Sequence, residues 1–289
     1  MKGVAIIGAG RLGTSLAYAL SKKGYTITAL SCRSMDSAEE SRQTIGQGRA
    51  SSDNVRTAKR GEIVILSVPD DEIESVVEDL ARAGSDWEEK VVFHCSGMLD
   101  SNLLDALRAL GARTASVHPC MSFPEKQRTQ DLFQGIYFAL EGEDQAVAAA
   151  KDMIDAIGGL HFMIRPEDKA CYHTACSMAS NMSVALLYTA VSLLGQCGLS
   201  EDSAKKVLRP LLEGTLRNVN KIDIFKALTG PVTRGDLITI QKHLTELEKF
   251  PSARRIYIDL AKQALEMTRR EKKISDKKIR SLEALLGRE

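Results

Sequence analysis

The sequence predicts an α/β protein in which a doubly wound parallel sheet is followed by a smaller all-α domain. Short, continuously apolar segments alternate with helical segments up to residue 164, a pattern typical of parallel strands covered on both faces. From Pro166 onward the strand patterns stop and only helical periodicity remains. The 289 residues suffice for two domains of ordinary size. We therefore place the domains at 1–165 and 166–289.

The elements of the first domain follow from runs of apolar residues and their boundaries. A buried strand is expected wherever a short apolar run is bounded by turn or helix signals. The predicted strands are 2–7, 25–30, 62–68, 90–94, 113–117, 136–140 and 160–164. The predicted helices between them are 14–23, 36–47, 52–59, 70–81, 100–110 and 144–157.

The second domain is predicted to begin with one long helix, 167–196. This helix is apolar on most of its surface, which predicts deep burial. Gly198 ends it, and Ser200 is the expected N-cap of the next helix. The remaining predicted helices are 200–220, 234–249, 253–268 and a charged, solvated tail that reaches residue 289.

The first strand runs directly into Gly8-Ala-Gly-Arg-Leu-Gly13, a G-x-G-x-x-G sequence that opens a helix. In this context the glycines permit a tight turn, the approach of a pyrophosphate to the backbone, and close packing of the helix on the strand. The motif therefore predicts a dinucleotide site on a Rossmann-type sheet. The expected contacts are Gly8, Ala9, Gly10, Arg11, Leu12 and Gly13.

The end of the second strand indicates which dinucleotide is bound. Sites that prefer NAD usually carry an acidic residue there, whereas this chain reads Ser31-Cys-Arg-Ser34. The guanidinium of Arg33 and the hydroxyl of Ser34 suit a 2′-phosphate, and Arg11 offers a second cation. We therefore predict NADP as the cofactor. The alternative is that Arg33 is an ordinary solvated loop residue.

Further contacts are expected where other strands end, because ligands of open α/β sheets lie at the carboxyl ends of the strands. Val68 and Pro69 follow one strand, while Ser96 and Gly97 follow the next and suit the nicotinamide end of the cofactor. His118 precedes a proline, which favours an extended backbone that would direct its imidazole toward substrate. A purely structural histidine is the equal alternative.

The long helix carries a polar stripe. Lys169 and His173 are four residues apart and share a face, and Asn181 lies farther along it. We predict Lys169 as the proton donor or oxyanion stabiliser, His173 as its rival or partner, and Asn181 as an orienting group. The alternative is a polar network between the domains without catalysis.

The loop Gly230-Pro-Val-Thr-Arg-Gly-Asp236 is a second candidate for binding substrate. Arg234 suits a substrate carboxylate, and Asp236 is the second residue of this loop that we predict to bind substrate. The competing interpretation is a capping box for the next helix, formed by Thr233 and Asp236.

Composition narrows the classes of partner. A formal net charge of +1 and an aromatic content of 5% do not suggest nucleic-acid binding, and no stretch is expected to be long and apolar enough to cross a membrane. The six cysteines are scattered without a C-x-x-C pair, which indicates reduced thiols, a cytoplasmic protein and no metal site.

Several of these segments together resemble a bacterial family with a Rossmann-like domain and a helical C-terminal domain of unknown function. They are Gly8-Ala-Gly-Arg-Leu-Gly13, Ser67-Val-Pro-Asp-Asp71, His94-Cys-Ser-Gly97, Ser116-Val-His-Pro119, Asp168-Lys-Ala-Cys-Tyr-His173 and Leu228-Thr-Gly-Pro-Val-Thr-Arg-Gly-Asp236. The family is often labelled as NADP oxidoreductases. It is distantly similar to ketopantoate reductases, pyrroline-carboxylate reductases and β-hydroxyacid dehydrogenases, whose catalytic Lys lies where Lys169 falls. The β-hydroxyacid dehydrogenases carry Asn at the position of His173.

The resemblance implies a homodimer formed through the helical domain and a small substrate. Together with the motifs, it leads us to expect an NADP-dependent oxidoreductase that reduces a small carbonyl compound or an imine, with a 2-oxo acid such as ketopantoate as the best-motivated example. The alternatives are a deazaflavin-dependent NADP reductase and a regulator that binds NADP without catalysis.

Overall fold

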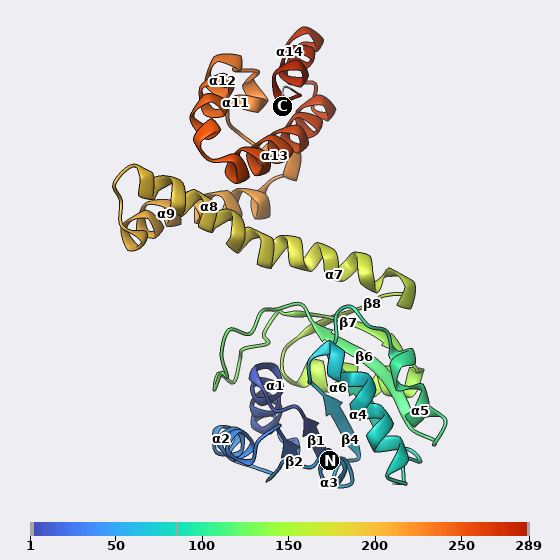
Figure 1. The fold of residues 1–289 in the computed structure, drawn as a ribbon. Helices are drawn as coiled ribbons and strands as arrows, with labels where there is room; N and C mark the ends of the chain where they lie inside the picture. The colour runs from blue at the N-terminus through green and yellow to red at the C-terminus, as the bar shows by residue number, and fades with distance from the viewer. Residues whose placement is uncertain (1–2, 85, 288–289) are drawn as a thin grey trace. The chain divides into compact units, whose positions relative to one another are not determined.

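The computed structural model describes residues 3–84 and 86–287 (Figure 1). The first predicted strand begins at Lys2 and the predicted tail ends at Glu289, and both residues lie outside the described ranges. The first half forms an eight-stranded sheet in the order β3-β2-β1-β4-β5-β6-β7-β8. The strands are β1 (Gly3–Ile7), β2 (Thr26–Ser31), β3 (Arg49–Ser51), β4 (Ile63–Leu66), β5 (Val91–His94), β6 (Arg113–Pro119), β7 (Tyr137–Gly142) and β8 (Leu160–Met163).

The predicted doubly wound fold is confirmed, with two differences. Strands β1 to β6 pair in parallel, but β7 pairs with β6 in the antiparallel sense. The connection from β6 to β7 contains no helix, so the chain turns back at the edge where β6 ends instead of crossing the sheet. Strand β3 was not predicted, because three residues, one exposed and two half-buried, give no periodic signal.

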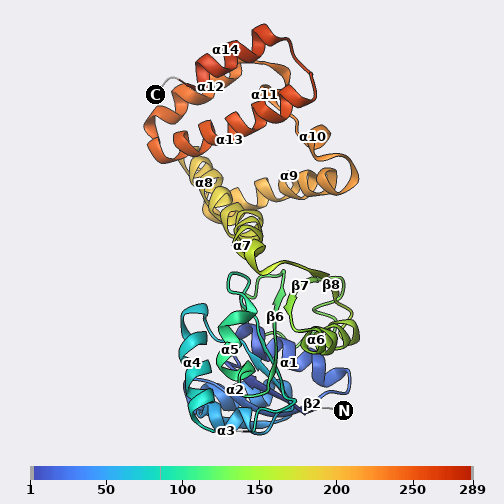
Figure 2. The same cartoon turned by 90° about the vertical axis from the view of Figure 1, so that its right-hand side faces the viewer.

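Helices cover both faces of this sheet (Figure 2). They are α1 (Arg11–Lys22), α2 (Met35–Ile45), α3 (Asn54–Ala58), α4 (Asp70–Arg82), α5 (Asp105–Arg108) and α6 (Asp144–Ala156). Alternate residues of β4 divide between two cores: Ile65 packs with α1, α2 and α6, while Leu66 packs with α3, α4 and α5. The continuous apolar strands therefore serve two cores at once, as the sequence pattern predicts.

The chain divides into two compact units, Met1–Met182 and Ser183–Glu289. The first unit includes α7 (Lys169–Ser177) and a π-helical turn (Met178–Met182). The second contains α8 (Ser183–Gln196), α9 (Glu201–Lys221), α10 (Ile224–Ala227), α11 (Pro231–Arg234), α12 (Leu237–Glu246), α13 (Pro251–Arg270) and α14 (Asp276–Leu286). Its core is formed by the four helices α11, α12, α13 and α14, with residues such as Ile240, Leu265 and Leu282. Ser200 caps α9, as predicted.

The predicted deep burial of the long helix is wrong within each of the two units. In α8 only Val191 is buried, and the side chains of Val184, Leu186 and Tyr188 are exposed. The helical run Pro166–Gln196 also has the length and hydropathy of a membrane span, which contradicts the expectation from sequence; one such helix is weak support for a membrane location. The apolar face exists as predicted, but the second unit by itself does not cover it.

Candidate functional site

The glycine loop joins β1 to α1 and shows why its first and last glycines are needed. Gly8 has a φ of +84°, a conformation that side chains disfavour, and the amides of Gly8 and Ala9 both donate to the carbonyl of Ser31, at 3.0 and 2.8 Å. At Gly13 a Cβ atom would lie 2.7 Å from the Gly8 carbonyl oxygen and would also collide with Ser67. The loop is therefore folded tightly against the ends of β2 and β4.

Gly10 differs from these two glycines because it opens onto free space. The nearest heavy atom to a Cβ placed there is the Gly8 carbonyl oxygen, at 3.9 Å. Gly10 is also the N-cap residue of α1, whose first turn carries no side-chain cap. Backbone N–H groups at such a helix start attract anions, and the space beside Gly10 lets one approach. The loop thus fits the pyrophosphate of a dinucleotide.

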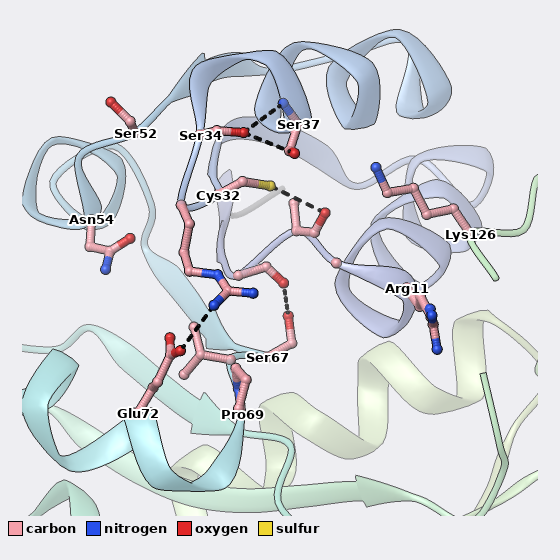
Figure 3. A pocket seen from close by; sticks show the side chains of 15 residues that line it. Arg11, Cys32, Ser34, Ser37, Ser52, Asn54, Ser67, Pro69, Glu72 and Lys126 are labelled. Atoms are coloured by element: carbon pink, nitrogen blue, oxygen red, sulfur yellow. Dashed lines mark hydrogen bonds and ion pairs between the residues drawn. The ribbon is translucent and has the colours of Figure 1, made fainter. Parts of the chain in front are cut away.

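A pocket of about 840 Å³ surrounds this loop (Figure 3). It contains three cations, Arg11, Arg33 and Lys126, and one carboxylate, Glu72. The remaining lining residues are Gly8, Ala9, Gly10, Cys32, Ser34, Ser37, Ser52, Asn54, Ser67, Val68 and Pro69. This excess of positive charge suits a ligand with several phosphate groups.

The end of β2 provides one side of the pocket. The side chain of Arg33 is 89% exposed and lies 3.7 Å from Glu72, a distance at which an exposed ion pair contributes little to stability. Ser34 caps α2 by accepting a hydrogen bond from the Ser37 amide, and the two hydroxyls lie 2.9 Å apart. Arg33 is therefore held loosely enough to turn toward a phosphate placed beside the two serines.

Lys126 was not predicted from the sequence. It lies in the irregular segment between β6 and β7, where the amide of Gln127 donates to the Ser15 hydroxyl of α1 at 3.0 Å. The Lys126 ammonium forms an ion pair with Glu40 of α2 at 2.6 Å. A lysine in a segment without periodicity gives no signal of its own, because only the tertiary fold brings it to the glycine loop.

The structure separates the predicted cofactor contacts into three groups. Gly8, Ala9, Gly10, Arg11, Arg33, Ser34, Val68 and Pro69 line the pocket at the glycine loop. Leu12 packs against the core instead, and Gly13 lies against Ser67. Ser96 and Gly97 lie at the end of β5, where they belong to a second polar cluster.

Ser96 is the centre of that second cluster. Its hydroxyl donates to the Asp70 carboxylate at 2.9 Å and accepts hydrogen bonds from the amides of Met98 and Leu99. Asp70 is not the N-cap of α4, a position that Pro69 takes; it instead anchors the turn after β5.

Lys169 lies beneath this turn. Only 1% of the residue is exposed, and its ammonium donates to the Ser96 carbonyl at 3.1 Å and to the Ser116 hydroxyl at 2.5 Å. Burial lowers the pKa of Lys169. The ammonium therefore holds the ends of β5 and β6 together from inside the first unit.

Two histidines, the buried His94 and the half-buried His118, stand close to this ammonium. His94 accepts from the Ser96 amide at Nδ1, so its Nε2 carries the proton donated to the Asp100 carbonyl at 2.9 Å. Burial lowers the pKa of His94 to about 4. Burial and the nearby Lys169 charge lower the pKa of His118 to about 4 as well, so both rings are neutral at pH 7.

His118 and His173 meet above Gly97. A Cβ atom on Gly97 would lie 2.6 Å from His173 Cδ2 and 2.8 Å from His118 Nε2, so only glycine fits beneath the two rings. The two rings lie edge to face with their centroids 5.8 Å apart. The Tyr172 hydroxyl is hydrogen-bonded to Nδ1 of His118 at 2.8 Å. The structure thus brings the predicted residues Gly97, His118 and His173 together with Tyr172, which the sequence did not single out.

The other predicted residues do not join this cluster within the first unit. Asn181 is exposed in the π-helical turn. Arg234 and Asp236 belong to the second unit, where Asp236 is the N-cap of α12 and accepts hydrogen bonds from both the amide and the hydroxyl of Thr239. The expected capping box is wrong in detail, because Thr233 lies inside α11 and donates to the Gly230 carbonyl instead. No group of three or more residues able to hold a metal ion occurs among the described residues.

Comparisons with known proteins agree with this fold. Residues 2–119 match the model of a Rossmann-like domain, and residues 136–264 match a domain of unknown function, DUF2520. A solved structure from Thermotoga maritima, a protein designated TM1727, is 30% identical, with 93% of this chain and 99% of that chain covered and a TM-score of 0.72. The chain belongs to the Rossmann-like–DUF2520 family.

Other solved structures resemble this DUF2520 protein. A candidate NADP oxidoreductase from Bacteroides fragilis is 25% identical, with 91% and 97% of the two chains covered and a TM-score of 0.77. The pyrroline carboxylate reductase of Plasmodium falciparum, solved with NADP bound, is 16% identical, with 92% and 97% covered and a TM-score of 0.61, which shows a shared fold. A comparison with curated protein sequences gave no match.

Proposed function

We propose that this protein is an NADP-dependent oxidoreductase that reduces a small carbonyl compound, with 2-oxo acids such as ketopantoate as the first class to test and imines as the second. The observation that carries the proposal is the glycine-loop pocket, which has open space beside Gly10 and is lined by the cations Arg11, Arg33 and Lys126. The oxidoreductase assignment of the Bacteroides relative supports the same class.

The pocket residues divide between two phosphate positions in this proposal. The first turn of α1, with Arg11, binds the pyrophosphate, since a helix start and a guanidinium both favour negative charge. Arg33 and Ser34 bind the 2′-phosphate, and Lys126 adds charge from the segment between β6 and β7. Glu72 disfavours an anion at the edge of the pocket, so Arg33 must exchange its loose ion pair with Glu72 for the phosphate.

The polar cluster at Gly97 performs the proton chemistry in this proposal. A reduced nicotinamide supplies a hydride, and the substrate oxygen then needs a proton. His173 is the proposed donor, because its ring lies over Gly97 and is only half-buried, whereas the Lys169 ammonium is enclosed by Ser96 and Ser116. Lys169 then has an indirect role: it holds the turn at Ser96 in place, and its charge lowers the pKa of His118.

The experiment that tests this proposal follows NADPH absorbance with a panel of 2-oxo acids and cyclic imines. We expect at least one of these compounds to be reduced, with NADPH preferred over NADH. Tight binding of NADPH without turnover of any compound would favour the regulator alternative, and the absence of binding would overturn the proposal.

We also propose that the protein is a homodimer formed through α8 and α9. Large apolar side chains are exposed on both helices, namely Val184, Leu186, Tyr188, Val207, Leu211, Leu212, Leu216 and Val219. Large exposed apolar side chains concentrated on two packed helices are typical of an interface. Light scattering should give twice the 31.6 kDa mass of the chain. The double variant Tyr188→Glu/Leu211→Glu should be monomeric, while Leu110→Glu, at an exposed apolar residue of the first unit, should not change the mass.

A further inference from the structure

Two cysteines lie in contact beside the histidine cluster. Cys120 follows β6 directly and is exposed, while Cys176 lies in the last turn of α7 and is half-buried. Their Sγ atoms are 3.5 Å apart, close enough for an S–H···S hydrogen bond. The two residues are separated by 56 positions in the sequence, so this contact is made by the fold and not by local geometry.

Tyr172 connects this pair to the proposed site. It precedes Cys176 by one helical turn, and its hydroxyl is bonded to His118 Nδ1 at 2.8 Å. Burial and hydrogen bonds to the two thiols raise the pKa of Tyr172, which therefore stays protonated. Both sulfurs therefore interact with the same hydroxyl that is bonded to His118.

We propose that Cys120 and Cys176 form a reversible disulfide that acts as a redox-sensitive clamp between the end of β6 and α7. A disulfide has an S–S distance of about 2.05 Å, so the two sulfurs must approach by about 1.5 Å. The proposal requires side-chain rotation and a small shift of α7 to supply this movement. The exposed Cys120 meets the oxidant first, and Cys176 is the resolving thiol.

The oxidant is a low-molecular-weight disulfide such as glutathione disulfide. The Cys120 thiolate attacks one of its sulfurs, the S–S bond of the oxidant breaks, and one thiol leaves with a proton. The Cys176 thiolate then attacks Sγ of Cys120, the mixed disulfide breaks, and the second thiol leaves with the other proton. Two protein thiols are oxidised and one small disulfide is reduced.

The clamp has a predicted consequence for the proposed reaction, and this part alone rests on the proposed function. Drawing Cys176 toward Cys120 removes the sulfur partners of the Tyr172 hydroxyl and disturbs its hydrogen bond to His118. Neither cysteine lines the glycine-loop pocket. Oxidation should therefore lower turnover by about fivefold or more while leaving the Kd for NADPH within about twofold.

The test incubates the full reduced chain with glutathione disulfide and counts free thiols after denaturation. We expect two of the six thiols to be lost, a peptide linking Cys120 to Cys176 by mass spectrometry, and full recovery with dithiothreitol. Cys176→Ser should instead retain one glutathione on Cys120, and Cys120→Ser should form no intramolecular disulfide. The matched control is Cys171→Ser, which removes an exposed thiol of the same helix and should leave the disulfide unaffected.

The outcomes are distinct from those of the proposed function, because thiol counting requires neither NADPH nor substrate. Six free thiols after oxidation, or a stable glutathione adduct on Cys120 of the unchanged protein, would overturn the disulfide. A complete disulfide with unchanged turnover would overturn its role as a switch.

Discussion

Replacing Gly10 by glutamate is expected to weaken NADPH binding at least about 100-fold without unfolding the protein. A Cβ atom at Gly10 contacts only one atom within 4 Å, the Gly8 carbonyl oxygen, so the fold accommodates the side chain. The glutamate side chain fills the space beside Gly10 and places a carboxylate where the pyrophosphate is proposed to lie. Steric exclusion and charge repulsion together exceed about 3 kcal/mol, which corresponds to that loss of affinity. Fluorescence titration with NADPH measures the effect.

Two further glycine variants serve as controls for this prediction. Gly10→Ala should weaken binding less, by about tenfold, because it adds volume without charge. Gly13→Ala should lower Tm as well as affinity, since its Cβ atom would lie 2.7 Å from the Gly8 carbonyl oxygen and 3.1 Å from Ile6 Cγ2. Wild-type affinity in Gly10→Glu would show that the cofactor is not bound at this loop.

The second large effect is expected on turnover, from His173→Asn. If His173 donates the proton, its loss should lower kcat about 100-fold, the usual scale for a general acid, with little change in Tm or in the Kd for NADPH. His161→Asn is the matched control, because His161 lies on β8, outside the cluster above Gly97, and should have no effect on kcat. An unchanged kcat in His173→Asn would exclude this histidine as the donor.

Lys169→Met separates positioning from proton donation. Loss of the two hydrogen bonds to Ser96 and Ser116 should destabilise the protein by about 2 kcal/mol, even though an apolar side chain of similar length fills the space. Because the Lys169 charge lowers the pKa of His118, its removal should raise that pKa, so His118 ring resonances should titrate at higher pH. A large loss of kcat with unchanged stability and an unchanged His118 titration would instead identify Lys169 as the direct donor.

The sequence predicts those features that depend on local patterns. The alternation of apolar strands and helices, the Gly8–Gly13 turn and the cap at Ser200 are all local, and the structure contains each of them. The antiparallel direction of β7 was not predicted, because an apolar strand has the same composition in either direction.

The site was predictable only in part, because tertiary contacts decide which side chains face a ligand. Lys126 reaches the pocket from a segment without periodicity. The sequence shows that Lys169 and His173 share a helix face. It does not show that Lys169 is enclosed under Ser96 while His173 lies above Gly97. The exposed face of α8 also reads as buried in sequence, since an apolar helix gives the same pattern whether its partner is the same chain or another.

The most direct test of the central claim is a titration of the protein with NADPH and with NADH, repeated on Arg33→Ala. We predict that the wild-type protein binds NADPH at least about tenfold more tightly than NADH, and that Arg33→Ala loses about tenfold in affinity for NADPH alone. Equal affinities for the two cofactors, or an Arg33→Ala variant that keeps the preference, would contradict a 2′-phosphate site at the end of β2.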